Sequence, residues 1–455
     1  MRLFNFLILI VTFQLAFTLE ARVKYNKINI NYESSNYEAG AKYCYSRIGN
    51  KNLIASFFIP VPIDYHHQER GVSQLFVWLN KPFDPLKKTL VFIDGGPGNT
   101  SHDMRFQVDD WNVIFFDQRG NSCSRPENES LFLDNKFYSS KNTANDIEMI
   151  RRFFNVNKIS IYAVSYGTVP AQIYAHLYPK HLQSVVLEGT IFQGGELLIS
   201  PKFKLSLLNS FFQSLDKKTQ QRIVELSGHS NSFVEWFAAV GNFMMYLDDS
   251  FNKFEQFLNL MLWDNEGAFA LISTFKYNLD FIEPDFGASE VVLGMLGCKE
   301  LGMNLAGLSP LAYFEKNPSK NSQVWKLKQS RFNYQQQKYC KKLGFNSDSF
   351  EEVYSAIKYP SHIPTFYIQG EYDGATVLDQ ALKHFFYVSY NQKQLLIAKK
   401  GGHQPFLSTF TNEAYSSSKF KVKMLILKKF LNAEMISENN VSDLNKNSDL
   451  QYYLY

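Results

Sequence analysis

The chain has 455 residues, of which 45% are hydrophobic and 20% are charged, and its formal net charge is +4. This length exceeds the roughly 250–300 residues that one hydrophobic core sustains, so we expect either a large domain with an insertion or two domains. The charge is too small, and too evenly spread, to predict a nucleic-acid partner. We attribute the 41 Phe and 26 Tyr to general use of aromatic residues rather than to a dedicated binding groove.

The N-terminus has the order of a secretory signal peptide. A positive charge at Arg2 precedes an apolar stretch, and small residues follow at Ala16, Thr18 and Ala21. We therefore exclude residues 1–21 from the fold and expect a secreted or periplasmic protein. No other segment approaches the ~20 apolar residues of a spanning helix, so we predict no membrane span in the mature protein.

The four cysteines of an exported chain predict disulfides. Four cysteines allow three connectivities, and their spacing fits no metal site. The arrangement that we favour pairs Cys298 with Cys340, and Cys44 with Cys123.

Strand and helix patterns alternate along most of the chain. Residues 52–61 and 73–80 predict an antiparallel pair that opens the fold. The buried-strand and helix patterns that follow are 89–93, 112–116, a helix that includes Ile147 and Ile150, 158–162, a helix from 168, and 184–187. This order predicts a mostly parallel sheet with helices on both faces.

The pattern changes after residue 189 and returns near residue 360. We predict a core at 22–189, a helical cap or lid at 190–359 inserted after the sixth strand, and a second core part at 360–432. The insertion is expected to lie over the site and to shape the substrate pocket. Residues 433–455 are rich in Asn and Ser, which predicts a loosely ordered polar tail.

Ser165 lies where the strand at 158–162 gives way to a helix. The small residues Ala163 and Gly167 each lie two positions from Ser165, one before it and one after it. The strained turn of a nucleophile elbow requires small residues at these positions. Because a serine hydroxyl needs a base to remove its proton, the elbow predicts catalysis only together with a histidine and an acid.

Two later strands supply these partners. The strand before residue 370 delivers Asp373 into a glycine-flanked loop, and His403 follows two glycines at the end of the strand at 394–398. Asp379 is a weaker candidate for the acid. The order Ser…Asp…His is that of α/β-hydrolases, so we predict this fold and a triad of Ser165, Asp373 and His403.

An oxyanion hole is predicted beside the elbow. The loop Asp94-Gly95-Gly96-Pro97-Gly98 follows a buried strand and can present backbone N–H groups without interfering side chains. We expect the N–H groups of Gly96 and Tyr166 to bind the oxyanion. Asp117 and Arg119 are expected to pair with each other and stiffen the neighbouring loop.

Together these motifs resemble the proline iminopeptidase and tripeptidyl aminopeptidase family of serine peptidases. The matching segments are Gly95-Gly96-Pro97-Gly98, Asp117-Gln118-Arg119-Gly120, Val164-Ser165-Tyr166-Gly167-Thr168, Gln369-Gly370-Glu371-Tyr372-Asp373 and Gly401-Gly402-His403, with Ile59 to Tyr65 and the Cys298 region in addition. The sequence departs from the family at Asp94, where many relatives have histidine, and at Ala163, which replaces the first glycine of the elbow.

The resemblance implies an aminopeptidase that acts through an acyl-enzyme, without a metal or organic cofactor. Its partner would be a peptide or another small acyl substrate, and the oligomeric state is not predicted. Recognition of a substrate ammonium group requires carboxylates, for which Glu371, Glu300 and Glu188 are the candidates. Two alternatives stay open: an esterase or amidase of the same fold, because a triad does not specify the acyl group, and a catalytically silent binding protein.

Overall fold

The computed structural model describes residues 55–101, 104, 106–126, 129–134, 136–193, 201–229, 248, 251–252, 255, 259, 288–301, 340–341, 362–389 and 392–455. The predicted signal peptide at 1–21 lies outside the described residues, as does Cys44. The described strands are β1 (Ala55–Pro62), β2 (Val72–Leu79), β3 (Lys88–Ile93), β4 (Trp111–Phe116), β5 (Ile159–Val164), β6 (Leu182–Glu188), β7 (Thr365–Gly370), β8 (Lys393–Lys399) and β9 (Gln451–Leu454).

These strands form one sheet in the order β1-β2-β4-β3-β5-β6-β7-β8-β9. β1 with β2, β2 with β4, and β8 with β9 are antiparallel pairs, and β3 to β8 run parallel. Ile93 pairs with Ala163, and Val164 with Glu188, so the carboxyl ends of the central strands meet at one edge. The predicted α/β fold with a mostly parallel sheet is confirmed, and its carboxyl edge is where ligands bind in such sheets.

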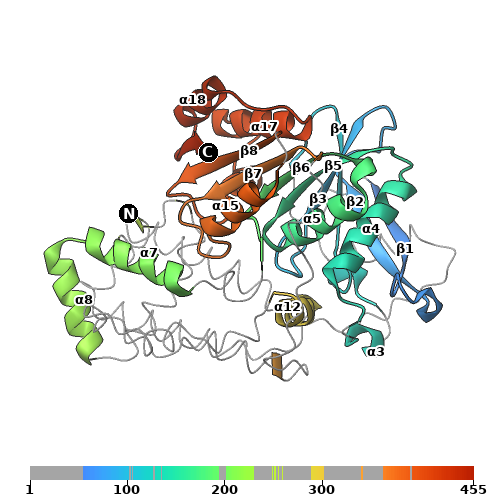
Figure 1. Ribbon diagram of the computed structural model, residues 1–455, viewed down its shortest axis with the longest axis horizontal. Helices are drawn as coiled ribbons and strands as arrows, with labels where there is room; N and C mark the ends of the chain where they lie inside the picture. Colours follow the sequence, from blue (N-terminus) through green and yellow to red (C-terminus); the bar gives the residue numbers. More distant parts are fainter. Residues whose placement is uncertain are drawn as a thin grey trace. The chain divides into compact units, whose positions relative to one another are not determined.

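Helices cover both faces of the sheet. The longer helices of the core are α4 (Ser140–Phe153), α5 (Thr168–Leu177), α15 (Leu378–Tyr387) and α17 (Ser418–Leu431), and the shorter ones are α3 (Glu129–Phe132) and α16 (Leu407–Asn412). α4, α5 and α15 lie on one face and α17 lies on the other (Figure 1). Ser139 and Ser417 cap the first turns of α4 and α17 by accepting backbone N–H groups, as small hydroxyl residues do.

The two faces differ in composition. Aliphatic side chains such as Ile161 and Leu187 pack toward α4 and α5. The other face is rich in aromatic rings, with Trp78 stacked on Phe115 and Phe366 stacked on Phe430 of α17 at 4.4 and 4.5 Å between centroids. Many of the aromatic residues therefore contribute apolar area to the core.

Between β6 and β7, the described elements are helices: α7 (Pro201–Ser214), α8 (Lys217–His229) and α12 (Ala288–Lys299). The described part of the segment between β6 and β7 is therefore helical, as expected from the sequence. Its predicted bounds at 190–359 and its role as a lid stay predictions.

The predicted loose tail is wrong. Residues after 433 form α18 (Glu438–Lys446) and β9, and β9 extends the sheet by pairing with β8. Val441, Leu444 and Tyr452 are buried, while Ser437 and Asn440 form a capping box at the start of α18. The polar composition gave a wrong prediction because Ser and Asn cap a helix in this segment.

Within the described residues, no helix is long and apolar enough to span a membrane.

Candidate active site

Ser165 lies in a strained turn between β5 and α5. Its φ of 54° is in the left-handed region, which costs energy for a residue with a side chain. Ser165 is partly exposed although Val164 and Tyr166 on either side are buried. At Gly167, a Cβ would lie 2.5 Å from the carbonyl oxygen of Ile93, so only glycine fits there. The backbone thus presents the hydroxyl group at the carboxyl edge of the sheet.

The glycine loop after β3 packs against this serine. A Cβ at Gly95 would lie 2.8 Å from Cβ and 3.3 Å from Oγ of Ser165, so the absence of a side chain leaves room for the nucleophile. Gly96 and Gly98 have φ of 103° and 96°, and the bond between Gly96 and Pro97 is cis. These conformations explain why the sequence places glycine at both positions.

The two N–H groups expected at the oxyanion hole belong to the residues that follow Gly95 and Ser165, which pack closely against each other. The N–H of Gly95, the glycine before Gly96, is already used, because it donates to Oδ1 of Asp94 at 2.6 Å. The assignment of the N–H groups of Gly96 and Tyr166 as the oxyanion donors stays a prediction.

His403 and Asp373 form a buried pair at the ends of β8 and β7. Nδ1 of His403 lies 2.9 Å from Oδ2 and 3.0 Å from Oδ1 of Asp373. Donation from Nδ1 leaves Nε2 as the nitrogen that can accept a proton, which is the tautomer that a general base requires.

Two residues that the sequence analysis missed orient the carboxylate of Asp373. Thr376 donates its N–H to Oδ1 at 2.8 Å and its hydroxyl to Oδ2 at 2.7 Å, and Gln369 donates Nε2–H to Oδ2 at 2.9 Å. Ala375 N–H donates to Oδ1 at 2.8 Å. The sequence signal for Thr376 is its place three residues after Asp373, where hydroxyl residues pair with an aspartate in a turn.

The end of β6 also supports this pair. A Cβ at Gly189 would lie 3.0 Å from Cε1 of His403 and 3.0 Å from Oγ1 of Thr376, and Gly189 has a φ of 62°. Gly189 therefore permits the imidazole ring to pack directly on the backbone.

Glu188 lies beneath the loop that follows β8 and carries His403, residues 400–406, which we call the histidine loop. It is not in an open site. It is fully buried, and its carboxylate accepts N–H groups from Phe406 at 2.6 Å and Leu407 at 3.2 Å, and the hydroxyl of Tyr162. Burial raises its pKa to about 7, although these hydrogen bonds and the nearby Lys423 act in the opposite direction. Its predicted role in binding a substrate amine does not fit these contacts.

Glu300 follows α12 and contacts the start of α4. It is 3% exposed, and Ser140 donates to it both its N–H, at 3.1 Å, and its hydroxyl. The Ser140 hydroxyl also lies 2.8 Å from the Tyr166 hydroxyl. Burial, with the Glu300 charge in addition, raises the pKa of Tyr166 well above its usual value. Glu300 therefore connects the end of α12 to the core beside the elbow, and its carboxylate is buried against Ser140.

Glu371 is the predicted amine-binding acid with a partly exposed side chain. It follows β7, two residues before Asp373, and Oε2 accepts the N–H of Lys400 at 2.9 Å. Its position at the carboxyl edge is compatible with contact to a substrate.

Of the two acids considered as the partner of the histidine, Asp373 makes the contact, whereas Asp379 is 62% exposed and lies near Lys383 on α15.

The expected pairing of Asp117 with Arg119 is wrong. Arg119 forms a bidentate ion pair with Asp146 of α4, at 2.8 Å from Nε and 2.5 Å from the terminal nitrogen. Asp117 instead accepts the N–H of Cys123 at 3.1 Å. Both residues are buried, so the loop is fixed by partners distant in sequence. The sequence of this loop does not indicate that the partner of Arg119 lies on α4.

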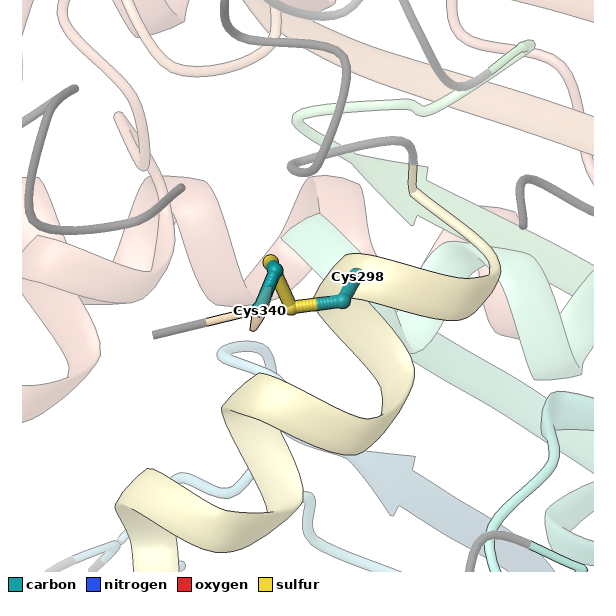
Figure 2. Close-up of a disulfide and its surroundings, with 2 residues drawn as sticks. All are labelled: Cys298 and Cys340. Atoms are coloured by element: carbon teal, nitrogen blue, oxygen red, sulfur yellow. A yellow bond between two sulfur atoms is a disulfide. The ribbon is translucent and has the colours of Figure 1, made fainter. Parts of the chain in front are cut away.

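Cys298 and Cys340 are joined by a disulfide, with their Cα atoms 5.6 Å apart (Figure 2). This bond attaches residue 340 to the last turn of α12, two residues before Glu300. Because Cys44 lies outside the described residues, its pairing with Cys123 stays a prediction.

Among the residues that the structure describes, no group of three or more His, Cys, Asp or Glu is arranged to hold a metal ion.

Curated relatives of this chain are proline iminopeptidases. A probable proline iminopeptidase of Leptolyngbya boryana is 27% identical over 116 residues, which are 25% of this chain and 35% of that protein. The proline iminopeptidase of Neisseria gonorrhoeae is 29% identical over 129 residues, which are 28% of this chain and 40% of that protein. The matches thus span well under half the length of these relatives, and they confirm the resemblance predicted from the motifs.

A crystal structure of a proline iminopeptidase from Mycobacterium smegmatis aligns with a TM-score of 0.39 at 12% identity, covering 83% of this chain and 97% of that one. The family model described as the alpha/beta hydrolase fold matches residues 88–409, which contain β3 to β8 and the three residues predicted as the triad. The chain belongs to the alpha/beta hydrolase fold family.

Proposed function

We propose that the protein is a serine aminopeptidase of the prolyl or tripeptidyl type, with Ser165, His403 and Asp373 as its triad. The observation that carries this proposal is the hydrogen-bonded pair of His403 and Asp373 at the sheet edge where Ser165 occupies a strained turn. Similarity to proline iminopeptidases supports a peptide as the substrate.

The chemistry follows from these groups. Nε2 of His403 removes the proton from Ser165 as Oγ attacks the carbonyl carbon, and the imidazolium then protonates the leaving amine. Asp373 keeps the proton on Nδ1 and stabilises the positive charge of the ring. A water molecule, deprotonated by His403 in the same way, releases the acyl group from Ser165.

The N–H groups of Gly96 and Tyr166 would bind the oxyanion that forms at each tetrahedral stage. The close approach of Gly95 to Ser165 at the carboxyl edge of the sheet supports this assignment. Loss of one such donor typically costs roughly 3–4 kcal/mol of transition-state stabilisation.

For the substrate ammonium group, we propose Glu371. It is partly exposed, whereas the carboxylates of Glu188 and Glu300 are enclosed by internal donors.

We also propose that the protein is exported through the segment at 1–21, and N-terminal sequencing of the mature protein tests this. The insertion predicted at 190–359 would set substrate length and side-chain preference.

The test compares three substrates with the purified protein: a chromogenic peptide with a free N-terminus, the same peptide with an acetylated N-terminus, and a simple aryl ester. We expect cleavage of the free peptide and little or none of the acetylated one. Equal cleavage of both peptides would contradict an aminopeptidase, and turnover of the ester alone would favour an esterase. Ser165→Ala is the control that must remove every activity.

A further inference from the structure

Two residues of the predicted insertion contact the loops that carry His403 and Asp373. Gly402 donates its N–H to Oδ1 of Asp248 at 2.9 Å, and the Ser408 hydroxyl donates to Oδ2 of Asp248 at 3.4 Å. Three residues further along the chain, the ring of Phe251 stacks on Tyr372 with 4.6 Å between centroids and 28° between planes. We call Asp248 and Phe251 the insertion clamp.

Each principal contact of the insertion clamp falls on the residue directly before one member of the acid–base pair. Gly402 precedes His403, and Tyr372 precedes Asp373. The two loops are also joined to each other, because Tyr372 donates its N–H to the carbonyl oxygen of Gly401 at 2.9 Å. The insertion clamp therefore spans the two loops that must stay in register for His403 and Asp373 to meet.

The histidine loop requires such support because it begins with two glycines. Glycine has the largest backbone freedom, and a Cβ at Gly401 would lie 2.6 Å from Cβ of Ala398, so a stiffer residue does not fit at that position. A Cβ at Gly370 would lie 1.9 Å from the carbonyl oxygen of Gly402, so the two loops pack backbone on backbone. A hydrogen bond from Gly402 N–H to a carboxylate is one of the stronger kinds available to fix this peptide.

The surroundings favour a carboxylate at residue 248 and an aromatic ring at residue 251. Lys423 of α17 attracts Asp248, and its ammonium group donates to the carbonyl oxygen of Pro405 at 2.6 Å. Phe251 also meets the ring of Phe211 in α7 edge-on, with 5.4 Å between centroids. The insertion clamp thus connects a helix of the insertion with both loops of the core.

We infer that Asp248 and Phe251 are positioning residues for the His403–Asp373 pair, so that the insertion supports the chemical step in addition to shaping the substrate pocket. The inference rests on the proposed function of Ser165, His403 and Asp373. It predicts that loss of the insertion clamp slows every reaction of Ser165, even with a reagent too small to require the substrate pocket.

The experiment measures the second-order rate constant for labelling of Ser165 by a small alkyl fluorophosphonate, which bonds to Oγ and releases fluoride. The variants are Asp248→Ala, Asp248→Asn and Phe251→Leu. Glu225→Ala is the matched control, because Glu225 is an exposed acid of the insertion that pairs with Arg222 on α8. Unfolding midpoints and kcat and KM for an aryl ester are measured for each variant.

We expect Asp248→Ala to label about tenfold more slowly than the wild type, with kcat reduced and KM unchanged. Asp248→Asn keeps an oxygen acceptor for Gly402 N–H and should label within about threefold of the wild type. Phe251→Leu should label about threefold more slowly because it loses the ring contact, which tests the inference even if Asp248→Ala fails to fold. Glu225→Ala should match the wild type.

Wild-type labelling rates in both Asp248→Ala and Phe251→Leu would overturn the inference, as would an Asp248→Asn variant as slow as Asp248→Ala. A change confined to KM would also overturn it, since that would indicate a role in substrate binding alone. Absence of labelling in the wild type would instead contradict the proposed function.

Discussion

Glu188, the last residue of β6, accepts the backbone N–H of Phe406 at 2.6 Å, three residues after His403. A buried carboxylate thus anchors the far end of the histidine loop to the sheet. On the other side, Asp248 accepts the N–H of Gly402 directly before His403. The imidazole is carried by a short segment whose two ends are held by carboxylates.

Replacing Glu188 with Gln should change how stability depends on pH. Burial raises the Glu188 pKa from 4.5 to about 7, so between these values the folded protein holds one more proton than the unfolded chain. Stability therefore falls as pH rises through this window. Relative to Glu188→Gln, the wild type should lose about 3 kcal/mol of unfolding free energy between about pH 4.5 and pH 7.5. Urea unfolding across this range measures the difference, and a constant difference would contradict the assignment.

Asp373→Asn should lower kcat by about 10⁴-fold with little change in KM, because Asn cannot hold the required histidine tautomer. The carboxylate makes the direct contact with Nδ1 of His403. Asp379→Asn is the matched control and should retain wild-type activity, since Asp379 is exposed on α15. Activity close to wild type in Asp373→Asn would remove Asp373 from the triad.

Gly95→Ala should slow acylation without unfolding the protein. The new methyl group would approach Cβ of Ser165 to 2.8 Å, which is too close unless the serine or the loop moves. A misplacement of about 1 Å at the reacting atom can cost about 100-fold in rate, which is the loss we expect in kcat/KM. Steady-state kinetics and an unfolding midpoint are the measurements, and unchanged kinetics would show that Gly95 does not confine the nucleophile.

Removing the disulfide with Cys298→Ser and Cys340→Ser should destabilise the insertion. The bond closes a sequence separation of 42 residues, for which the chain-entropy relation gives about 4 kcal/mol. Because the bond ends beside Glu300, which contacts Ser140 near the elbow, we expect activity to be lost at a lower urea concentration than in the wild type. Inactivation and unfolding curves would detect this, and coincidence with the wild-type curves would refute it.

Glu371→Gln tests the amine site proposed for the substrate. Loss of the carboxylate should raise KM for an N-terminally free peptide by about tenfold or more, because a charge-assisted contact is lost. Hydrolysis of an aryl ester without an amine should not change. An equal effect on both substrates would indicate that Glu371 only supports Lys400 and the neighbouring loop.

The core of this fold was predictable because its signals are local. A buried strand followed by glycines, as at Gly95 and Gly402, indicates a tight loop wherever it occurs. In a parallel sheet such loops meet at one edge, which is why the strand-end positions of Ser165, Asp373 and His403 led to the prediction that they form one site.

The errors concern interactions between distant parts of the chain. Arg119 pairs with Asp146, and no spacing rule connects a loop residue to a helix 27 positions away. Thr376 and Gln369 orient Asp373 through side-chain geometry that a sequence does not display. The final strand was missed because β9 is only four residues long and follows a polar helix, so its pairing with β8 depends on tertiary contacts.

The roles of Ser165 as nucleophile and His403 as base are tested by measuring the site and rate of fluorophosphonate labelling in the wild type and in His403→Ala, with the modified residue mapped by mass spectrometry. We expect one modified residue, Ser165, in the wild type, and a rate at least about 1,000-fold lower in His403→Ala. Labelling of another residue, or an equal rate at Ser165 without the imidazole of His403, would contradict these roles.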